Sequence, residues 1–282
     1  HTPSKTFMKG GKQYEVVDGA KITHTFGDAT KTYQVEYKQV ITDENTPQPI
    51  QVNYVDLATG EDLQIHQYTV DPGKTKTIEV DTTVEIDGKT HVLSPNQEST
   101  ITHKFGEETT EYNVYFNEKG LEVDKYEVSV TYMNVSNTYV GEDTLYTTKL
   151  EANVGQELNI EVPAQYEANG TTYVLMSGQA TSYSHDFYST RRNYVMVYRD
   201  VNDTQNEIEF IPGETGTDLA ATTPGGTNFT IDGGTGNPMI TNPDGTVTTV
   251  DQDGQIVPYE EPQTEVVDEN ETPLAKGDKS TS

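Results

Sequence analysis

Three segments of this 282-residue chain repeat one pattern at intervals of about 80 residues, which limits the folds open to it. Each carries a histidine, then a phenylalanine two residues on, then a Tyr-rich stretch that begins seven residues later. The histidines are His24, His103 and His185, so successive copies lie 79 and 82 residues apart. A unit of this length is a small domain rather than a solenoid repeat. The sequence therefore predicts a truncated first repeat at 1–40 (its C-terminal half) and complete repeats at 41–120 and 121–200.

The Tyr-rich end of each repeat alternates at period two, which is typical of a strand with one buried face. In the second repeat the alternating residues are Tyr112, Val114 and Phe116. The short polar connection at 106–108 predicts a hairpin with the segment before it. Further strands are expected at 51–55 and 127–132, and a short helix around 144–152 stays open. The predicted fold class is mainly β.

Residues 201–282 differ in composition from the repeats. They hold 16 acidic residues and two lysines, Lys276 and Lys279, so they carry half of the chain's net charge of −28. They also hold seven of the 13 prolines and several Gly-rich runs. Such a composition predicts an extended acidic Pro/Gly/Thr-rich stalk, with one short hairpin at 240–258.

The overall composition excludes several classes of partner and site. A strongly acidic chain repels nucleic acid and anionic membranes, and no apolar run is long enough to span a bilayer. The absence of cysteine excludes disulfides and Cys-based catalysis or metal binding. The chain opens on His1 rather than Met, so we expect a fragment or a processed form.

The recurring histidines suggest a catalytic or metal-binding role, but we expect them to be packed and hydrogen-bonded instead. One histidine per domain cannot form a shared metal site unless the domains fold back on each other. Ser182, Ser184 and Asp186 surround His185, yet adjacent strand residues point to opposite faces. The carboxylate pairs at 107–108 and 260–261 read as solvated charge. The chain is therefore predicted not to be an enzyme and to need no cofactor.

Three other motifs have a functional and a structural reading. Asp251 and Asp253 are weak calcium candidates because they partly match an acidic calcium loop, although a hairpin turn explains the same residues. Lys125 or Lys149 with Asn193 could form an intramolecular isopeptide bond, but nothing in the sequence selects them. The pair Arg191-Arg192 reads as a turn rather than an anion site.

Short motifs in the second repeat resemble a known family. Val52-Asn53-Tyr54-Val55-Asp56, followed by Thr59-Gly60-Glu61-Asp62-Leu63, resembles the opening of mucin-binding-protein (MucBP-type) repeats of Gram-positive cell-wall-anchored surface proteins. Residues 271–275 resemble a stretch that often precedes the sorting signal of such proteins. The third repeat departs from the pattern, with Tyr132-Met133-Asn134 in place of Tyr-Val-Asp. The resemblance implies β-grasp-like domains arranged end to end, and it carries over no site residue.

The resemblance also implies a function, which is adhesion to mucin or another host glycoprotein or glycan, outside the cell and at the cell wall. Shallow Tyr-rich faces or the loop at 134–141 would carry the binding. One alternative is a passive stalk or self-associating filament subunit that displays another domain. Another is a noncatalytic accessory module of a secreted polysaccharide-degrading enzyme. An adhesin should expose clustered aromatics on one face, whereas a spacer should bury its tyrosines at the joints between repeats.

Overall fold

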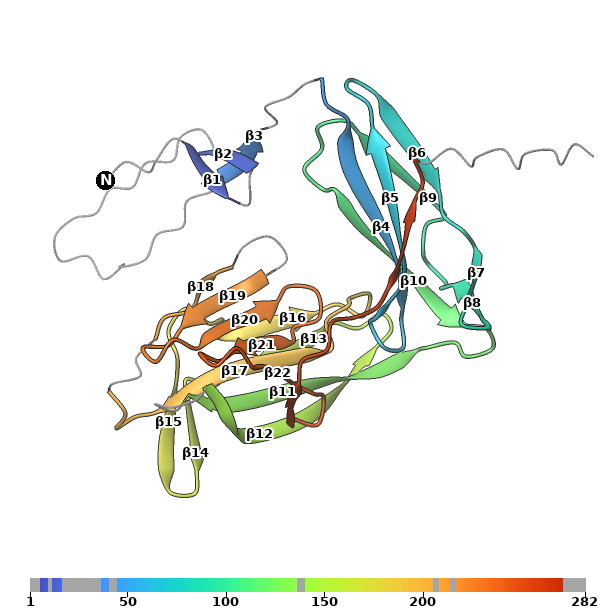
Figure 1. Cartoon of the computed structure of the whole chain (residues 1–282). Coiled ribbons are helices and arrows are strands. Elements are labelled where there is room, and N and C mark those ends of the chain that lie inside the picture. Colours follow the sequence, from blue (N-terminus) through green and yellow to red (C-terminus); the bar gives the residue numbers. More distant parts are fainter. Residues whose placement is uncertain are drawn as a thin grey trace, which may run out of the picture.

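The computed structural model describes residues 6–9, 12–16, 37–40, 45–135, 140–204, 208–213 and 217–270, with side chains from residue 45 onward except at 135–143. Every regular element in these ranges is a β-strand, so the mainly β prediction is confirmed (Figure 1). No helix long and apolar enough to cross a membrane occurs among them. Ahead of the second repeat, three short strands form an antiparallel sheet: β1 (Thr6–Lys9), β2 (Lys12–Val16) and β3 (Tyr37–Val40).

The two complete repeats share one sequence of seven strands. The second repeat contains β4 (Gln48–Asp56), β5 (Asp62–Val70), β6 (Thr75–Glu79), β7 (Thr83–Ile86), β8 (Lys89–Leu93), β9 (Thr100–Lys104) and β10 (Glu111–Glu118). The third contains β11 (Lys125–Val135), β12 (Val140–Asn153), β13 (Leu158–Glu161), β14 (Gln165–Ala168), β15 (Thr171–Leu175), β16 (Ser182–His185) and β17 (Asn193–Asp200).

The strands of both repeats are also joined in the same order. The second repeat has the sheet order β5-β4-β10-β8-β7, and the third has β12-β11-β17-β15-β14. In each repeat the first and last strands lie side by side and parallel, while the other pairs formed between strands of the same repeat are antiparallel. A separate two-stranded ribbon, β6–β9 or β13–β16, completes each repeat.

Two local expectations differ from the structure. The polar connection at 106–108 does not close a hairpin, because β9 pairs with β6 and β10 pairs with β4 and β8. The connection instead carries the chain from the ribbon to the centre of the sheet. The segment considered as a short helix, 144–152, lies within the long strand β12, which pairs with β11 along most of its length.

The alternating side chains form the core of each repeat, as strand geometry requires. In the second repeat Ile50, Val52 and Tyr54 of β4 pack with Val114 and Phe116 of β10, all of them buried. In the third repeat β17 is buried on both faces from Asn193 to Val197. A central parallel strand with two buried faces needs a second layer on the side away from the ribbon.

Residues 208–258 provide that layer, where the sequence predicts an extended stalk. They fold into an antiparallel meander in chain order, from β18 (Ile211–Pro212) through β19 (Thr217–Thr222), β20 (Asn228–Asp232), β21 (Pro238–Thr241), β22 (Val247–Val250) and β23 (Ile256–Pro258). The hairpin expected at 240–258 corresponds to the last part of this meander, where β22 pairs with β23.

The meander folds because a few apolar side chains are spaced to share one face. Phe229 and Ile231 on β20 and Ile240 on β21 are fully buried against Met133 and Val197 of the third repeat, among others. Averaged over 82 residues, this small apolar set is outweighed by Gly, Pro, Thr and acidic residues. Composition therefore predicts an extended segment, whereas the sheet of the third repeat supplies the partner surface that the segment lacks alone.

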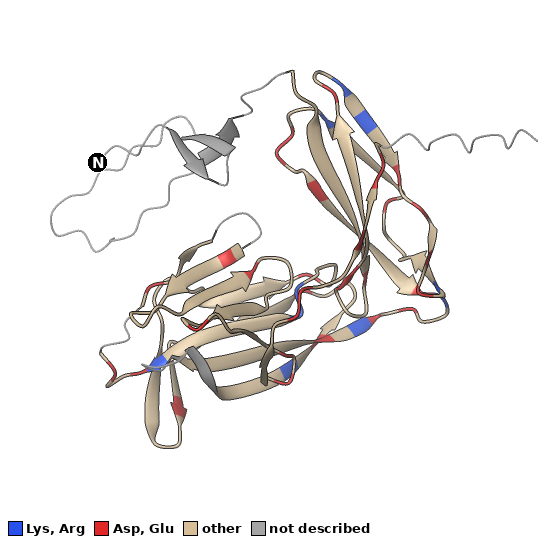
Figure 2. Ribbon diagram, in the orientation of Figure 1, with Lys and Arg blue, Asp and Glu red and all other residues tan. Residues whose placement is uncertain are grey.

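The chain then returns to the second repeat. After β23, strand β24 (Glu265–Asp268) pairs in parallel with β5, so it extends the sheet of the second repeat at its edge (Figure 1). Asp and Glu residues lie in both repeats and in the meander (Figure 2). Residues 271–282, which include the stretch resembling a sorting-signal neighbour, lie outside the described residues.

Truncating one buried meander side chain tests whether this segment is a folded layer. We expect Phe229→Ala to lower the free energy of unfolding by about 3 kcal/mol or more, because a buried phenyl ring is lost and a cavity remains. Met239→Ala, in the next strand of the same sheet at 39 % exposure, is the control and should cost less than about 1 kcal/mol. Urea unfolding measures both variants, and equal small effects would support the extended stalk instead.

Candidate functional site

Four tyrosines of the third repeat form a connected cluster, here called the tyrosine face: Tyr132, Tyr146, Tyr166 and Tyr198. The ring centroid of Tyr132 lies 5.3 Å from that of Tyr146, 5.2 Å from that of Tyr166 and 5.1 Å from that of Tyr198. Tyr146 and Tyr166 also contact each other at 5.8 Å. Such tilted and edge-to-face pairs hold aromatic rings in fixed relative positions.

Strand pairing explains why these residues meet. Tyr132 on β11 is directly opposite Tyr146 on β12, and Tyr132 is also beside Met196 on β17, with Tyr198 further along. All four side chains lie on the face of the sheet opposite the meander, since Met133 and Val197 pack on the meander side. Tyr146 is 41 % exposed and Tyr166 is half-buried, so the cluster reaches solvent at this end of the sheet.

The environment of the tyrosine face favours the neutral phenol at Tyr132 and Tyr198. Burial raises the pKa of Tyr132, and Tyr146 and Tyr166 add to the effect. Burial also raises the pKa of Tyr198, whose hydroxyl donates to the carbonyl oxygen of Pro163 at 2.7 Å. The face therefore offers apolar ring surface with neutral hydroxyls, which suits an uncharged polar ligand better than an ion.

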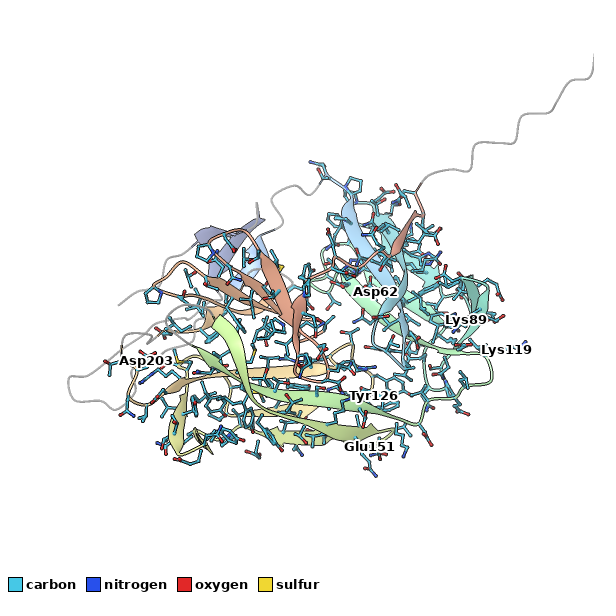
Figure 3. All side chains as sticks on the ribbon, turned by 60° about the horizontal axis from the view of Figure 1, so that its bottom comes forward. Asp62, Lys89, Lys119, Tyr126, Glu151 and Asp203 are labelled. Atoms are coloured by element: carbon cyan, nitrogen blue, oxygen red, sulfur yellow. The ribbon has the colours of Figure 1, made fainter. Side chains whose placement is uncertain are left out.

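A second cluster holds the two repeats together and is called here the joint. Arg192 is 5 % exposed, and its guanidinium carbon lies 3.6 Å from the ring centroid of Tyr126, which Figure 3 labels. Its Nη2 donates to the carbonyl oxygen of Leu57 in the second repeat at 2.7 Å. Leu57 and Tyr115 belong to the same apolar core as Tyr126, so the core of the third repeat continues into the second.

The joint has further contacts from the loop before β17. Tyr115 and Tyr188 have ring centroids 5.7 Å apart, and the Tyr188 hydroxyl donates to the carbonyl oxygen of Pro95 at 3.0 Å. Arg191 pairs with Asp218 of the meander at 3.1 Å. The Arg191-Arg192 pair is therefore part of the packing between three units and not merely a turn.

The recurring histidines are packed and hydrogen-bonded, as predicted, wherever the structure describes them. His103 contacts the Tyr112 hydroxyl at 2.8 Å and the side-chain oxygen of Gln48 at 2.9 Å. His185 contacts the hydroxyls of Tyr194 at 2.8 Å and Tyr126 at 2.7 Å. His24 lies outside the described residues.

His185 is held as the neutral imidazole with its proton on Nε2. The Tyr126 hydroxyl donates to the carbonyl oxygen of Phe187 at 2.6 Å, so its oxygen is left to accept from His185. Burial lowers the pKa of His185 to about 4, and the charge of Arg192 adds to this. Both ring nitrogens have tyrosine partners, whereas the Ser184 hydroxyl donates to Glu157. The structure does not align His185 as a base for Ser184.

The two calcium candidates act within the turn between β22 and β23. Oδ1 of Asp251 accepts from the backbone N–H groups of Asp253 and Gln255 at 2.9 and 2.8 Å, which is a turn geometry. Asp253 forms an ion pair with Lys149 of β12 at 2.7 Å. Among the described residues no group of three or more His, Asp or Glu side chains is placed to hold a metal ion.

The isopeptide candidates are not brought together. Lys125 pairs with Glu151 at 3.1 Å and Lys149 with Asp253, and both lysine side chains are exposed to solvent. Asn193 is buried elsewhere, and its Nδ2 donates to the carbonyl oxygen of Val250 in the meander at 3.1 Å. Of the predicted binding loop at 134–141, residues 136–139 lie outside the described residues.

An acidic cleft of about 800 Å³ separates the second repeat from the meander. Asp62, Glu111 and Asp232 line it, together with residues 262–264 of the segment that leads to β24. Burial raises the pKa of Asp62, and the charges of Glu111 and Asp232 raise it further. The cleft therefore disfavours anionic ligands. Its carboxylates come from strands far apart in the sequence, so no local motif could have indicated it.

No protein-family model matches this chain, and a search of curated proteins finds no match either.

One glycine tests the joint. Gly60 has φ +76°, and a Cβ at this position would lie 2.6 Å from the backbone carbonyl oxygen of Thr190 in the third repeat. Gly60→Ala should therefore push the repeats apart. Gly88→Ala is the matched control, because Gly88 has the same φ of +76° with nothing within 4 Å of the added Cβ.

Both variants pay the cost of a left-handed alanine, about 1 kcal/mol, and only Gly60→Ala adds the clash. Spin labels on cysteines introduced at Lys89 and Glu151 report the distance between the repeats. We expect a broadened distance distribution for Gly60→Ala and an unchanged one for Gly88→Ala. Equal distributions would mean that the joint does not hold the repeats in solution.

The low pKa of His185 predicts a loss of stability in acid. Between pH 6.5 and 4 the unfolded chain binds a proton at this residue and the folded chain does not, so stability falls as the pH is lowered through this window. The full effect is ~3 kcal/mol at pH 4 and below. Urea unfolding of the wild type and of His185→Gln from pH 7 to about 4 measures it. Parallel pH profiles for the two proteins would contradict the assignment.

Proposed function

We propose that this chain is an adhesin-type surface protein that binds a host glycoprotein, mucin or glycan through the tyrosine face of its third repeat. The observation that carries the proposal is the fixed cluster of Tyr132, Tyr146, Tyr166 and Tyr198, two of which reach solvent. Hexose rings present apolar C–H faces edged by hydroxyls. A neutral aromatic surface with phenol hydroxyls complements both of these features.

The position of the face in the molecule favours presentation. The second repeat begins with Gln48 of β4, which pairs with Val70 at the C-terminal end of β5. Strand β24 ends at Asp268, which pairs with Gln67 near the same end of β5. Both chain exits therefore lie at one end of the second repeat (Figure 1). Tyr132 lies six residues beyond Tyr126 along β11, which places it roughly 20 Å past the joint. The tyrosine face is thus on the part of the body directed away from the attachment points.

The repeats and the location belong to the same proposal. A parallel central pair made by the first and last strands is compatible with the β-grasp-like arrangement that the MucBP resemblance implies. We further propose that the protein is extracellular and associated with the cell wall, that it is not an enzyme and that it needs no cofactor. The acidic composition supports the proposed class of partner, since it disfavours nucleic acid and anionic membranes.

A passive spacer is the second candidate, and the joint is the observation that favours it. Tyr115, Tyr126 and Tyr188 are packed between or beside the two repeats, as a spacer would require. The spacer hypothesis predicts that the wild-type protein binds no mucin or glycan and keeps a narrow distance distribution across the joint. That combination of results would favour the spacer over the adhesin.

Removing one exposed ring tests the adhesin proposal. Tyr146→Ala should weaken binding to an immobilised mucin glycoprotein or to a positive glycan on an array by about tenfold or more, because a central aromatic contact is lost. The matched control is Tyr259→Ala, since Tyr259 is exposed to a similar degree, 38 % against 41 %, and lies outside the cluster. Biolayer interferometry measures both. Equal affinities of the two variants would remove the tyrosine face from the proposal.

A further inference from the structure

Strand β24 is an addition to the plan of the repeat. The strand equivalent to β5 in the third repeat is β12, which has β11 as its one sheet neighbour among the described residues. In the second repeat the same edge is covered by β24, which comes from a segment 195 or more residues further along the chain. An uncovered strand edge offers unpaired N–H and C=O groups to any extended segment.

The contacts on this edge are specific to the sequence of the segment. Gln64 Nε2 donates to Glu265 Oε2 at 2.8 Å, and His66 Nδ1 lies 2.6 Å from Glu269 Oε1. The backbone N–H and the hydroxyl of Thr69 both donate to Asn270 Oδ1 at 2.9 Å. The Glu269 N–H donates to the carbonyl oxygen of Gln67 at 3.0 Å. Three side chains of β5, those of Gln64, His66 and Thr69, therefore hydrogen-bond to three residues of this chain's own C-terminal segment.

The segment is held without a core of its own. Val266 is 53 % exposed, and residues 259–263, which connect the meander to β24, are all exposed. Glu260 and Glu261 repel each other and favour an extended connection. With polar contacts and little buried apolar surface, β24 belongs to the least stable class of elements, which open locally while the rest of a protein stays folded.

We propose that β5 of one copy accepts residues 265–270 of a second copy in place of its own β24, so that copies are linked by strand exchange. The exchanged strand makes every contact that the internal strand makes, because donor and acceptor are the same sequences. The second copy is favoured over an unrelated partner, since Gln64, His66 and Thr69 already match Glu265, Glu269 and Asn270. This inference is independent of the tyrosine face.

Two forces set the conditions for exchange. A short connection keeps the internal strand at an effective concentration of about 1 mM, so exchange needs a comparable local density of chains. The net charge of −28 opposes association and is screened by salt. Strand exchange should therefore increase with protein concentration and with ionic strength.

Cysteine trapping tests the proposal directly, because these 282 residues include no cysteine. Gln67 and Asp268 are opposite each other in the β5–β24 register and both are exposed. One protein carries Gln67→Cys and the other Asp268→Cys; the two are mixed at high concentration and salt and then oxidised. The control mixture pairs Gln67→Cys with Asp244→Cys, which lies in an exposed turn of the meander.

We expect about tenfold more disulfide-linked heterodimer from the first mixture than from the control. A single chain carrying both Gln67→Cys and Asp268→Cys confirms that the geometry permits the disulfide. If that chain closes its internal disulfide while the mixture yields no more heterodimer than the control, exchange does not occur. If the internal disulfide fails to form, β24 does not pair with β5 in solution and the premise is lost.

A shortened connection provides a second measurement. Deleting residues 260–262 removes about 10 Å of reach, so β24 can no longer seat on its own β5 without strain. We expect this variant to form dimers or larger species in size-exclusion chromatography with light scattering, and Glu269→Ala in the same background to reduce them. A variant that stays monomeric at every concentration would overturn the proposal.

Discussion

Each complete repeat is built around one pair of parallel strands, the first and the last of the repeat, and the rest of the structure depends on this pairing. Parallel neighbours cannot be joined by a tight turn, so the five strands between them must loop around and return. Because the two strands run in the same direction, their C-terminal ends lie at the same end of the sheet. In the second repeat this places Leu57 and Tyr115 together, where Arg192 and Tyr126 of the third repeat meet them.

The same pairing explains why the acidic C-terminal region is folded. A parallel pair at the centre of a sheet presents apolar side chains on both faces. In the third repeat one face is covered by the β13–β16 ribbon, the tyrosines and the joint, and the other carries Met133, Val195 and Val197. The meander buries this second face, and its turn at 251–254 docks on β12 through Lys149 and Thr144.

The arrangement has two consequences for the proposed role. The joint and the meander make the second repeat, the third repeat and residues 208–258 one packed body, which positions the tyrosine face relative to the rest. The return of β24 brings both chain exits to the opposite end. A body with this path fits the proposed role of presentation, because the tyrosine face lies at the end away from both chain exits.

Repetition and alternation in the sequence were sufficient to predict a mainly β chain and the packed roles of His103 and His185. They also placed strands at 51–55 and 127–132, because period-two alternation depends only on local geometry.

Strand partners were not predictable in the same way. The connection at 106–108 has the local sequence of a hairpin, but β10 pairs with β4 at the centre of the sheet. Long-range packing, not the local sequence, decides this partner. The tyrosine face likewise joins residues from four strands, and no short motif links Tyr132 to Tyr166.

The meander shows most clearly what the sequence alone does not predict. Its composition is that of a disordered segment, and it is folded because Phe229, Ile231 and Ile240 pack on an apolar surface that the third repeat supplies. The sequence by itself thus determined which residues alternate and repeat; the tertiary structure decided which strands pair and which apolar residues find a partner, because burial depends on surfaces brought together from distant parts of the chain.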